Sequence, residues 1–198
     1  MGNLTSGKIL IDGVDISKIG LHTLRKAITP IPQEPILFTG TLRYNLDPFG
    51  QFPDSSLLKS LELVRLRHLV DNDTDGLNMK VSENGENFSA GQRQLICIAR
   101  ALLRQPIDRN HQSHILLMDE ATASVDPASE RLISEMIRRE FRECTVITIA
   151  HRLETVLSYD RVVVMASGQV VECDSPSYLL NDSKSYFHTL AKSAGLIN

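Results

Sequence analysis

The sequence predicts an α/β domain with a mostly parallel sheet, an inserted helical subdomain and a small antiparallel hairpin. Short apolar runs alternate with segments of helical periodicity, as in a layered α/β protein. One run, 115–119, is apolar up to its last residue, which is typical of a central parallel strand. The stretch from about 40 to 104 shows no strand pattern and therefore predicts the helical insertion.

The composition is that of an ordinary folded protein, and it excludes several function classes. The 198 residues are 42% hydrophobic and 23% charged, which is typical of a globular domain. A net charge of −3 gives no electrostatic reason to bind nucleic acid or an anionic membrane. The three cysteines are scattered and favour a reducing compartment over a disulfide framework. No apolar run reaches the roughly 18 residues that suggest a membrane helix.

The first part of the chain predicts a hairpin, a helix and a strand. Residues 8–16 contain two short apolar runs joined by Asp12-Gly13, a pair that favours a tight hairpin turn. The segment 21–27 suits a short helix, and the segment 27–33 predicts a buried strand that prolines interrupt.

Two amphipathic segments predict the helical subdomain. Residues 54–70 place apolar side chains at helical spacing, after Asp54 and two serines that can cap a helix. Residues 89–104 predict a second helix, in which Ser89 and Gln92 have the spacing of a capping box. A polar loop at 105–114 follows it.

The remaining residues predict further strands and helices in alternation. A helix over 126–141 opens with Asp126 as its cap and Pro127 at its first position. The other predicted elements are the central strand at 115–119, another buried strand at 145–150, a strand pair at 161–173 around Ser167-Gly168, and a C-terminal helix at roughly 175–193.

Polar side chains stand at the ends of three predicted strands. They are Gln33 after the first strand, Asp119 and Glu120 after the central strand, and His151 after the next one. In open α/β sheets, ligands bind outside the carboxyl ends of the strands. We therefore expect these side chains to lie along one edge of the sheet.

These residue types suit a nucleotide with a metal ion. Asp119 could hold Mg²⁺, directly or through water, because a hard cation prefers carboxylate oxygen. Glu120 could orient and activate an attacking water, and Gln33 could contact the metal or that water. His151 could polarise a terminal phosphate. Each residue alone also fits a plainer role, as the start of a loop or a structural histidine, but their occurrence together favours a site.

The start of the 89–104 helix is a second candidate site. A helix N-terminus presents unpaired N–H groups and the positive end of the helix dipole, and both favour phosphate. Ser89 adds a hydroxyl group, and Gly91 lets the backbone approach an anion closely. Taken alone, the pattern also fits a capping box without a ligand.

Together these motifs resemble the nucleotide-binding domain of ATP-binding cassette (ABC) transporters, over nearly the whole chain. The signature motif of that family is normally Leu-Ser-Gly-Gly-Gln, and here Phe88 and Ala90 depart from it. A further stretch, TLRYNLDPFG at 41–50, is similar to the second cassette of subfamily C, the multidrug-resistance-associated group. The matching motifs are IPQEPILF (Q-loop), FSAGQRQL (signature), ILLMDEATASVD (Walker B strand and D-loop) and IAHRL (switch histidine).

The resemblance implies a P-loop NTPase core of the ABC ATPase type and specific roles for the candidate residues. Residues 1–198 would form a partial nucleotide-binding domain, with a helical and signature subdomain at about 40–104 and a core at about 115–198. Family domains pair head to tail, with each ATP held between the P-loop of one domain and the signature of the other. The implied nucleotide contacts are Gln33, Ser89, Gly91, Gln92 and Asp126, the implied Mg²⁺ ligands are Gln33 and Asp119, and the implied catalytic residues are Glu120 and His151.

The resemblance also implies partners and a location. ATP and Mg²⁺ would be the cofactors, and a second nucleotide-binding domain would be the direct partner. Residues near Gln33 would meet the transmembrane domains of an exporter at the cytoplasmic face of a membrane, with no role for nucleic acid. Soluble family members fit less well, because one group carries a long coiled coil after the Q-loop and another carries two basic cassettes.

Residues 2–8 nearly match the P-loop pattern G-x-x-x-x-G-K-[ST], but three features argue against a P-loop. Ile9 stands where Ser or Thr is needed for Mg²⁺, no strand precedes Gly2, and a strand pattern rather than a helix follows Lys8. In the family, this stretch resembles the hairpin that comes after the P-loop and its helix.

We therefore expect the first strand, the P-loop and its helix to lie before Met1. On that expectation the sheet lacks its central strand, and apolar segments such as 115–118 lack a neighbour. Two functions remain open. The chain is either a piece of an ATP-hydrolysing exporter cassette, or a non-catalytic truncated cassette that offers its signature to a partner.

Overall fold

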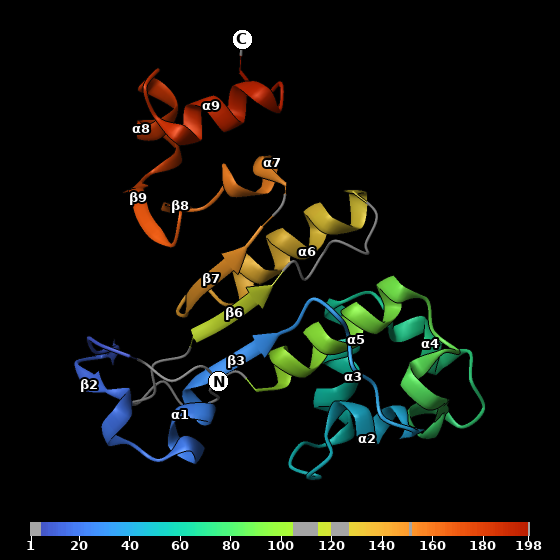
Figure 1. Cartoon of the computed structure of the whole chain (residues 1–198). Helices are drawn as coiled ribbons and strands as arrows, with labels where there is room; N and C mark the ends of the chain where they lie inside the picture. The colour runs from blue at the N-terminus through green and yellow to red at the C-terminus, as the bar shows by residue number, and fades with distance from the viewer. Residues whose placement is uncertain (1–4, 105–114, 120–126, 151, 198) are drawn as a thin grey trace. The chain divides into compact units, whose positions relative to one another are not determined.

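The computed structural model describes residues 5–104, 115–119, 127–150 and 152–197 (Figure 1). The chain divides into two compact units, Met1–Ile149 and Ala150–Asn198, and each is described by itself. Within the described residues, no helix combines the length and the apolar character needed to cross a membrane.

The sheet of the first unit has three parallel strands in the order β3-β6-β7. Strand β6 (Ile115–Asp119) lies between β3 (Ile28–Ile31) and β7 (Thr145–Ile149), and the three arrows point the same way in Figure 1. Leu116 and Met118 of β6 are buried in the main hydrophobic core. The predicted parallel sheet with 115–119 at its centre is confirmed.

Two expectations about these strands are wrong. Residues 115–118 do not lack a neighbour, because β6 pairs with a strand on each side. The strand at 145–150 is not buried on both faces, since Ile147 and Ile149 are 51% and 59% exposed. Val146 packs on the core from one face of β7, whereas the isoleucines lie on the opposite face, which the described residues of this unit leave open.

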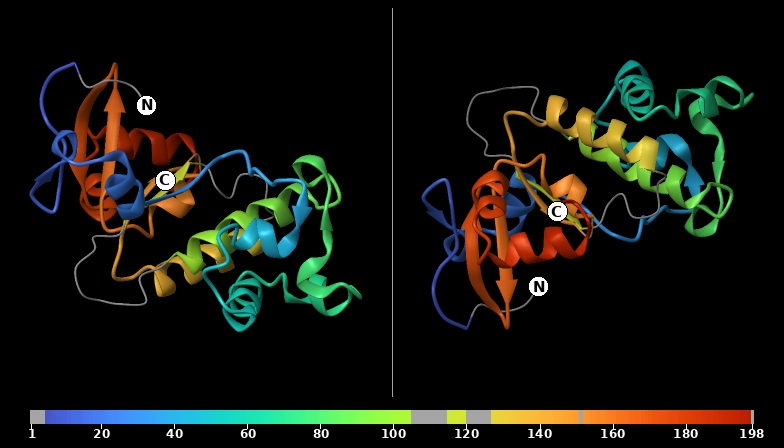
Figure 2. Two further views of the ribbon diagram at one scale, coloured as in Figure 1. Left: turned by 90° about the horizontal axis from the view of Figure 1, so that it is seen from below. Right: turned by 90° about the horizontal axis from the view of Figure 1, so that it is seen from above.

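Helices α2 (Leu42–Leu46), α3 (Asp54–Leu63), α4 (Arg67–Asp71) and α5 (Ala90–Leu103) form the predicted helical subdomain. Helices α2 and α3 pack against α5 (Figure 2). The residues that fill this core include Leu42, Leu57, Leu61, Ile96 and Ile98, all of them fully buried. The subdomain also contains 3-10 turns at Gly76–Asn78 and Glu83–Gly85 and one small ladder, β4 (Gly40–Thr41) with β5 (Lys80–Val81), which the sequence pattern did not predict.

The helix predicted over 54–70 is instead two helices, α3 and α4. Arg65 between them has φ +60°, which no helix residue adopts. This turn lets Val64 and Leu66 both enter the core, each 3% exposed, although a continuous helix would place them on different faces. Asp54 is the first helical residue and Pro53 occupies the cap position, so the predicted side-chain cap is absent from this described helix start.

The N-terminal elements follow the prediction. Strands β1 (Leu10–Ile11) and β2 (Val14–Asp15) pair as an antiparallel hairpin. Asp12 and Gly13 both have positive φ, at 49° and 78°, which is the geometry of the favoured hairpin turn. A 3-10 turn at Ile16–Lys18 leads to α1 (Leu21–Ala27), at the predicted position.

Helix α6 (Pro127–Glu140) follows β6 in the sequence and begins at the predicted proline. Its residues Ile133, Met136 and Ile137 join the main core. Asp126, the predicted cap, and the loop at 105–114 lie outside the described residues.

In its described residues, the second unit holds a hairpin and three short helices. Strands β8 (Val162–Ala166) and β9 (Gln169–Asp174) pair through Ser167-Gly168, both at positive φ, as predicted. The C-terminal helix is instead divided into α8 (Pro176–Asn181) and α9 (Tyr186–Ser193), after the short α7 (Leu153–Val156). Asp182 has extended backbone, and its carboxylate accepts a hydrogen bond from the N–H of Lys184, so a polar turn interrupts the helix.

A carboxylate from β9 caps α9. Glu172 accepts hydrogen bonds from the N–H groups of Tyr186 at 2.7 Å and Phe187 at 3.1 Å, and from the Ser185 hydroxyl at 3.0 Å. Burial raises the pKa of the Glu172 carboxyl, but these hydrogen bonds outweigh it and hold the pKa below its ordinary value. The hairpin and the last helix are therefore joined by an ionised group.

We expect Glu172→Gln to lower the free energy of unfolding by about 1 kcal/mol at pH 7, because the helix N-terminus loses its anion. A carboxyl whose pKa is lowered by folding stabilises above its unfolded pKa and loses that effect as pH falls through the folded pKa. The variant and wild type should therefore converge in acid. Urea unfolding at pH 7 and at pH 3 measures this, with exposed Asp160→Asn as the control. An unchanged difference at both pH values would contradict the assignment.

A tight glycine precedes α5. Gly85 has φ +69°, and a Cβ added there would lie 2.6 Å from Cδ1 and 3.1 Å from Cβ of Leu37, which is itself 2% exposed. Leu37 has no open space into which it can move without displacing the core. The turn that leads into α5 therefore requires glycine for both its backbone and its packing.

We expect Gly85→Ala to destabilise the chain by about 1–3 kcal/mol more than Gly50→Ala. Gly50 has φ +63° with nothing within 4 Å of an added Cβ, so the two variants share the backbone cost and differ in the clash. Urea unfolding of both variants measures the difference. Equal losses would mean that Leu37 moves aside freely.

Candidate functional site

Gln33 and Asp119 stand at the same edge of the sheet. Asp119 is the last residue of β6, and Gln33 follows the end of β3 by two residues. Because the two strands are parallel neighbours with Ile31 opposite Met118, their carboxyl ends lie side by side. Both residues are exposed. Glu120 and His151, the predicted catalytic residues, lie outside the described residues.

The donor types at this edge fit Mg²⁺ together with phosphate. Mg²⁺ is commonly held by one or two carboxylates, with phosphate and water oxygens completing its octahedron. Asp119 supplies an exposed carboxylate and Gln33 an amide oxygen. Among the described residues there is no group of three or more His, Cys, Asp or Glu that could form an all-protein metal site. One carboxylate and one amide oxygen fit Mg²⁺ that is bound together with phosphate oxygens.

The predicted capping box forms at the start of α5. Ser89 Oγ accepts a hydrogen bond from the N–H of Gln92 at 3.1 Å, and Gln92 Oε1 accepts one from the N–H of Ser89 at 2.9 Å. The first intrahelical bond runs from the N–H of Arg93 to the carbonyl of Ser89. The cap therefore fixes Ser89, Gly91 and Gln92 within a single turn.

Capping and anion binding are compatible at this helix start. The cap uses the Ser89 oxygen as an acceptor, so the hydroxyl hydrogen can still be donated outward. The N–H groups of Ala90 and Gly91 belong to the first turn, where a helix provides no internal acceptor. Ser89 and Ala90 are exposed, and the 14-residue helix adds its positive end. This turn is therefore a ready anion site.

The segment before α5 holds this turn in place. Phe88, which departs from the leucine of the family motif, is 4% exposed and acts as an apolar anchor directly before the cap. Arg93 Nη1 donates to the carbonyl of Phe88 at 3.0 Å. The Asn87 side chain bonds to Ser82 and to the carbonyl of Lys80. Any large apolar side chain at 88 serves the anchor, so this departure does not disturb the site.

Sequence reasoning missed two residues that connect the two candidate sites. Gln94 Nε2 donates to the carbonyl of Pro32 at 3.1 Å, and Arg100 Nη1 donates to the carbonyl of Ile36 at 2.6 Å. Both side chains therefore bind the main chain beside Gln33. The sequence offered only a weak signal, namely a polar residue at position 94 on the apolar side of the helix. In the structure Gln94 is 1% exposed, and the other buried residues of this helix are apolar.

The near match to a P-loop at residues 2–8 leads into the β1–β2 hairpin. Lys8 is exposed, and Ile9 accepts a hydrogen bond through its carbonyl from the N–H of Ile16. A P-loop passes into a helix, whose first N–H groups face the phosphates. The described part of this segment therefore has the geometry of a hairpin, as predicted.

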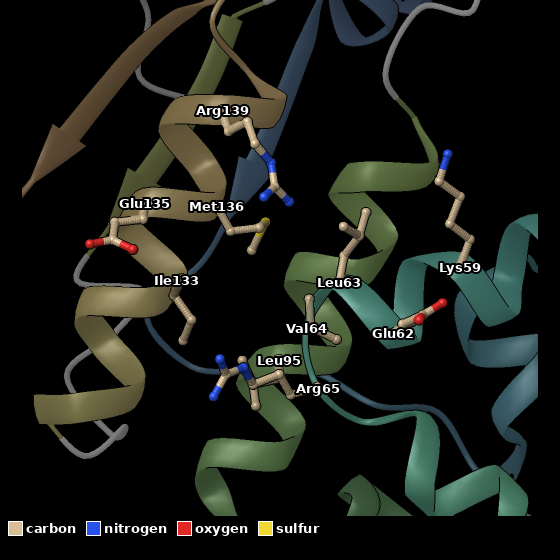
Figure 3. A pocket seen from close by; sticks show the side chains of 10 residues that line it. All are labelled: Lys59, Glu62, Leu63, Val64, Arg65, Leu95, Ile133, Glu135, Met136 and Arg139. Carbon is tan, nitrogen blue, oxygen red and sulfur yellow. The ribbon is translucent and has the colours of Figure 1, made fainter.

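A cavity of about 600 Å³ lies between α3, α5 and α6 (Figure 3). Ile133 and Met136 point into it from α6, across from Leu95 of α5, whereas Glu135 points away. Of the predicted site residues that the structure describes, none lines this cavity. Its lining consists of Lys59, Glu62, Leu63, Val64, Arg65, Leu95, Ile133, Glu135, Met136 and Arg139.

Comparisons with known proteins identify the family of this chain. The sequence profile of the ABC transporter family matches residues 1–123. Multidrug resistance protein mrp-7 of Caenorhabditis elegans is 51% identical over 188 residues, which is 95% of this chain and 12% of that protein. ATP-binding cassette sub-family C member 2 of Homo sapiens is 50% identical over 192 residues, 97% of this chain and 12% of that protein.

A solved structure shares the fold. The structure of a bacterial Atm1-family ABC exporter with ATP bound superposes with a TM-score of 0.83 at 31% identity. The match covers 96% of this chain and 32% of the exporter chain. The chain thus spans about an eighth of the length of these two curated relatives. With the family profile over residues 1–123 and half of all positions identical to subfamily C proteins, the chain belongs to the ABC transporter family, as a nucleotide-binding domain of the subfamily C type.

Proposed function

We propose that this cassette binds and hydrolyses ATP as part of an exporter, and that ATP hydrolysis drives transport across a membrane. The observation that carries the proposal is the first turn of α5. Its cap uses the Ser89 oxygen as an acceptor, so the Ser89 hydroxyl hydrogen and the Ala90 and Gly91 N–H groups can be donated to an anion.

In this function, the first turn of α5 contacts ATP that a partner cassette holds. Ser89 donates its hydroxyl hydrogen, and Gly91 brings a backbone N–H close to the phosphates. Gln92 keeps the turn in shape through its bond with the Ser89 N–H. Asp126, in the stretch that resembles the D-loop, contributes a further nucleotide contact.

The sheet edge serves the cassette's own nucleotide. Gln33 and Asp119 are the residues that would hold Mg²⁺, which neutralises phosphate charge when it is bound. Glu120 orients and activates the attacking water, and His151 hydrogen-bonds the terminal phosphate. The adjacency of the β3 and β6 carboxyl ends supports the pairing of Gln33 with Asp119.

The assembly would contain a second nucleotide-binding domain, paired head to tail, and transmembrane domains. The cassette would then lie at the cytoplasmic face of the membrane. The support is the likeness to an ABC exporter and to subfamily C proteins. Transport substrates would be selected by the transmembrane domains.

A second function is favoured by the hairpin after Lys8. In this second function the cassette is not catalytic, and it contributes only the first turn of α5 to ATP that a partner holds. The two functions differ in whether Glu120 matters.

We expect residues 1–198 alone to bind Mg²⁺–ATP weakly and to hydrolyse it negligibly, because the described segment around Lys8 is not a phosphate cradle. Phosphate release by the purified chain measures this, with Glu120→Gln as the matched variant. Robust turnover that disappears in Glu120→Gln would contradict the expectation and would establish a complete active site within these residues.

We expect Ser89→Asp to weaken ATP-dependent pairing with an intact subfamily C cassette by about tenfold or more, or about 1.4 kcal/mol or more. Aspartate caps a helix as well as serine does, so α5 should fold. Its carboxylate, however, removes the donor and places negative charge where phosphate would bind. Light scattering on the mixed cassettes with Mg²⁺ and a non-hydrolysable ATP analogue measures the pairing.

The control is Ser175→Asp, the same change at the cap of α8, where the serine oxygen accepts from the N–H of Tyr178. This variant should pair like wild type. Undiminished pairing of Ser89→Asp would remove the first turn of α5 from the nucleotide site.

A further inference from the structure

Helix α5 holds the main chain on both sides of Gln33. The chain that leaves β3 passes α5 on its way to α2 (Figure 1). Gln94 donates to the carbonyl of Pro32, one residue before Gln33, and Arg100 donates to the carbonyl of Ile36, three residues after it. Two side chains of one helix thus fix both ends of this short segment.

Arg100 also fixes the segment through Asn45 of α2. Its guanidinium donates to the Asn45 carbonyl and, at 2.7 Å, to Asn45 Oδ1. The Asn45 amide in turn accepts from the N–H of Phe38 at 2.8 Å and donates to the Phe38 carbonyl at 2.7 Å. The Arg100 guanidinium carbon lies 5.9 Å from the centre of the Phe38 ring, as a cation–π contact. Residues 36–38 are therefore held by Arg100 and by Asn45, which Arg100 itself binds.

The position of Gln94 lowers the stability of the core. It is 1% exposed, and its Oε1 atom has no hydrogen-bond partner among the described residues. A buried, half-satisfied amide destabilises a core relative to an apolar side chain of similar shape. Within the described part of the chain, the hydrogen bond to Pro32 is the one interaction that glutamine makes here and an apolar side chain could not make. This points to a role for that bond beyond stability.

We propose that Gln94 and Arg100 are positioning residues that tie Gln33 to α5. The proposal rests on the proposed function, in which the first turn of α5 contacts a partner's ATP and Gln33 serves the cassette's own site. Helix α5 is continuous over Ala90–Leu103, and its middle is fully buried at Ile96 and Ile98. Movement of its first turn on nucleotide contact is therefore carried to the Gln33 segment through these two side chains.

Hydrogen exchange tests the connection directly. The 198-residue chain is mixed with an intact subfamily C cassette, Mg²⁺ and a non-hydrolysable ATP analogue, and amide exchange is followed by mass spectrometry. In wild type, pairing should slow exchange at 89–93 and also at 33–38, by about tenfold or more in each segment. In Gln94→Met and Arg100→Lys, exchange at 89–93 should still slow, but exchange at 33–38 should not.

The two substitutions separate positioning from folding. Methionine has the shape of glutamine without its donor, and it removes the unpaired acceptor, so a merely structural residue would tolerate it. Lysine keeps the charge of Arg100 but cannot bind the Ile36 and Asn45 carbonyls as a fork. Arg104→Lys, at the exposed end of the same helix, is the matched control and should respond like wild type.

The outcomes are distinguishable. Slowing at 33–38 that persists in both variants, or that is missing in paired wild type, would overturn the proposal. If wild type shows no slowing at 89–93, the proposed function fails instead. The unpaired chain then decides: about tenfold faster exchange at 36–46 in Arg100→Lys than in wild type would support the tie to α5, and equal exchange would overturn it.

Discussion

Backbone carbonyls in irregular segments and at helix ends need hydrogen-bond donors, and in this protein side chains of α5 supply several of them. Gln94 serves Pro32, Arg100 serves Ile36 and Asn45, and Arg93 serves Phe88. The carbonyls of Pro32 and Ile36 belong to the segment around Gln33, that of Asn45 belongs to α2, and that of Phe88 belongs to the turn that leads into Ser89. The two candidate sites therefore depend on one helix, whose buried side is apolar except at Gln94.

Within the second unit, a side chain also binds the main chain of another element, but there it accepts hydrogen bonds instead of donating them. There a carboxylate on β9, Glu172, accepts from three donors at the start of α9. In both units a charged side chain joins an element to a helix or a loop distant in sequence. Such contacts are directional, so they define geometry more sharply than the apolar packing beside them.

Local patterns predicted the parts of the structure whose causes are local. The capping box at Ser89, the turn at Asp12-Gly13 and the proline at the start of α6 all act within a few residues, and all were found. The apolar run at 115–119 also predicted its central place, because burial on both sides leaves a compositional mark.

Features that depend on distant contacts were not predictable in the same way. Arg65 adopts a left-handed conformation with neither glycine nor proline nearby, because Val64 and Leu66 both gain burial. The exposure of Ile147 depends on which elements cover that face of the sheet, and the composition of the strand does not contain this information. The break at Asp182, by contrast, has a local cause. Aspartate favours a turn, and that preference outweighs the helical spacing of the apolar residues around it. The partners of Gln94 and Arg100 could not be read from spacing at all.

Those partners are 62, 55 and 64 residues away along the chain. During synthesis, the segment after β3 emerges long before the helix that supplies its donors. Until α5 forms, the carbonyls of Pro32 and Ile36 are bound to water, and the apolar side chains of Ile36 and Phe38 have no fixed direction. Contacts between residues so far apart in sequence carry a loop-closure entropy cost that local helices and hairpins do not, so they form later. The surroundings of Gln33 are thus the part of the first unit that acquires its native order late in folding.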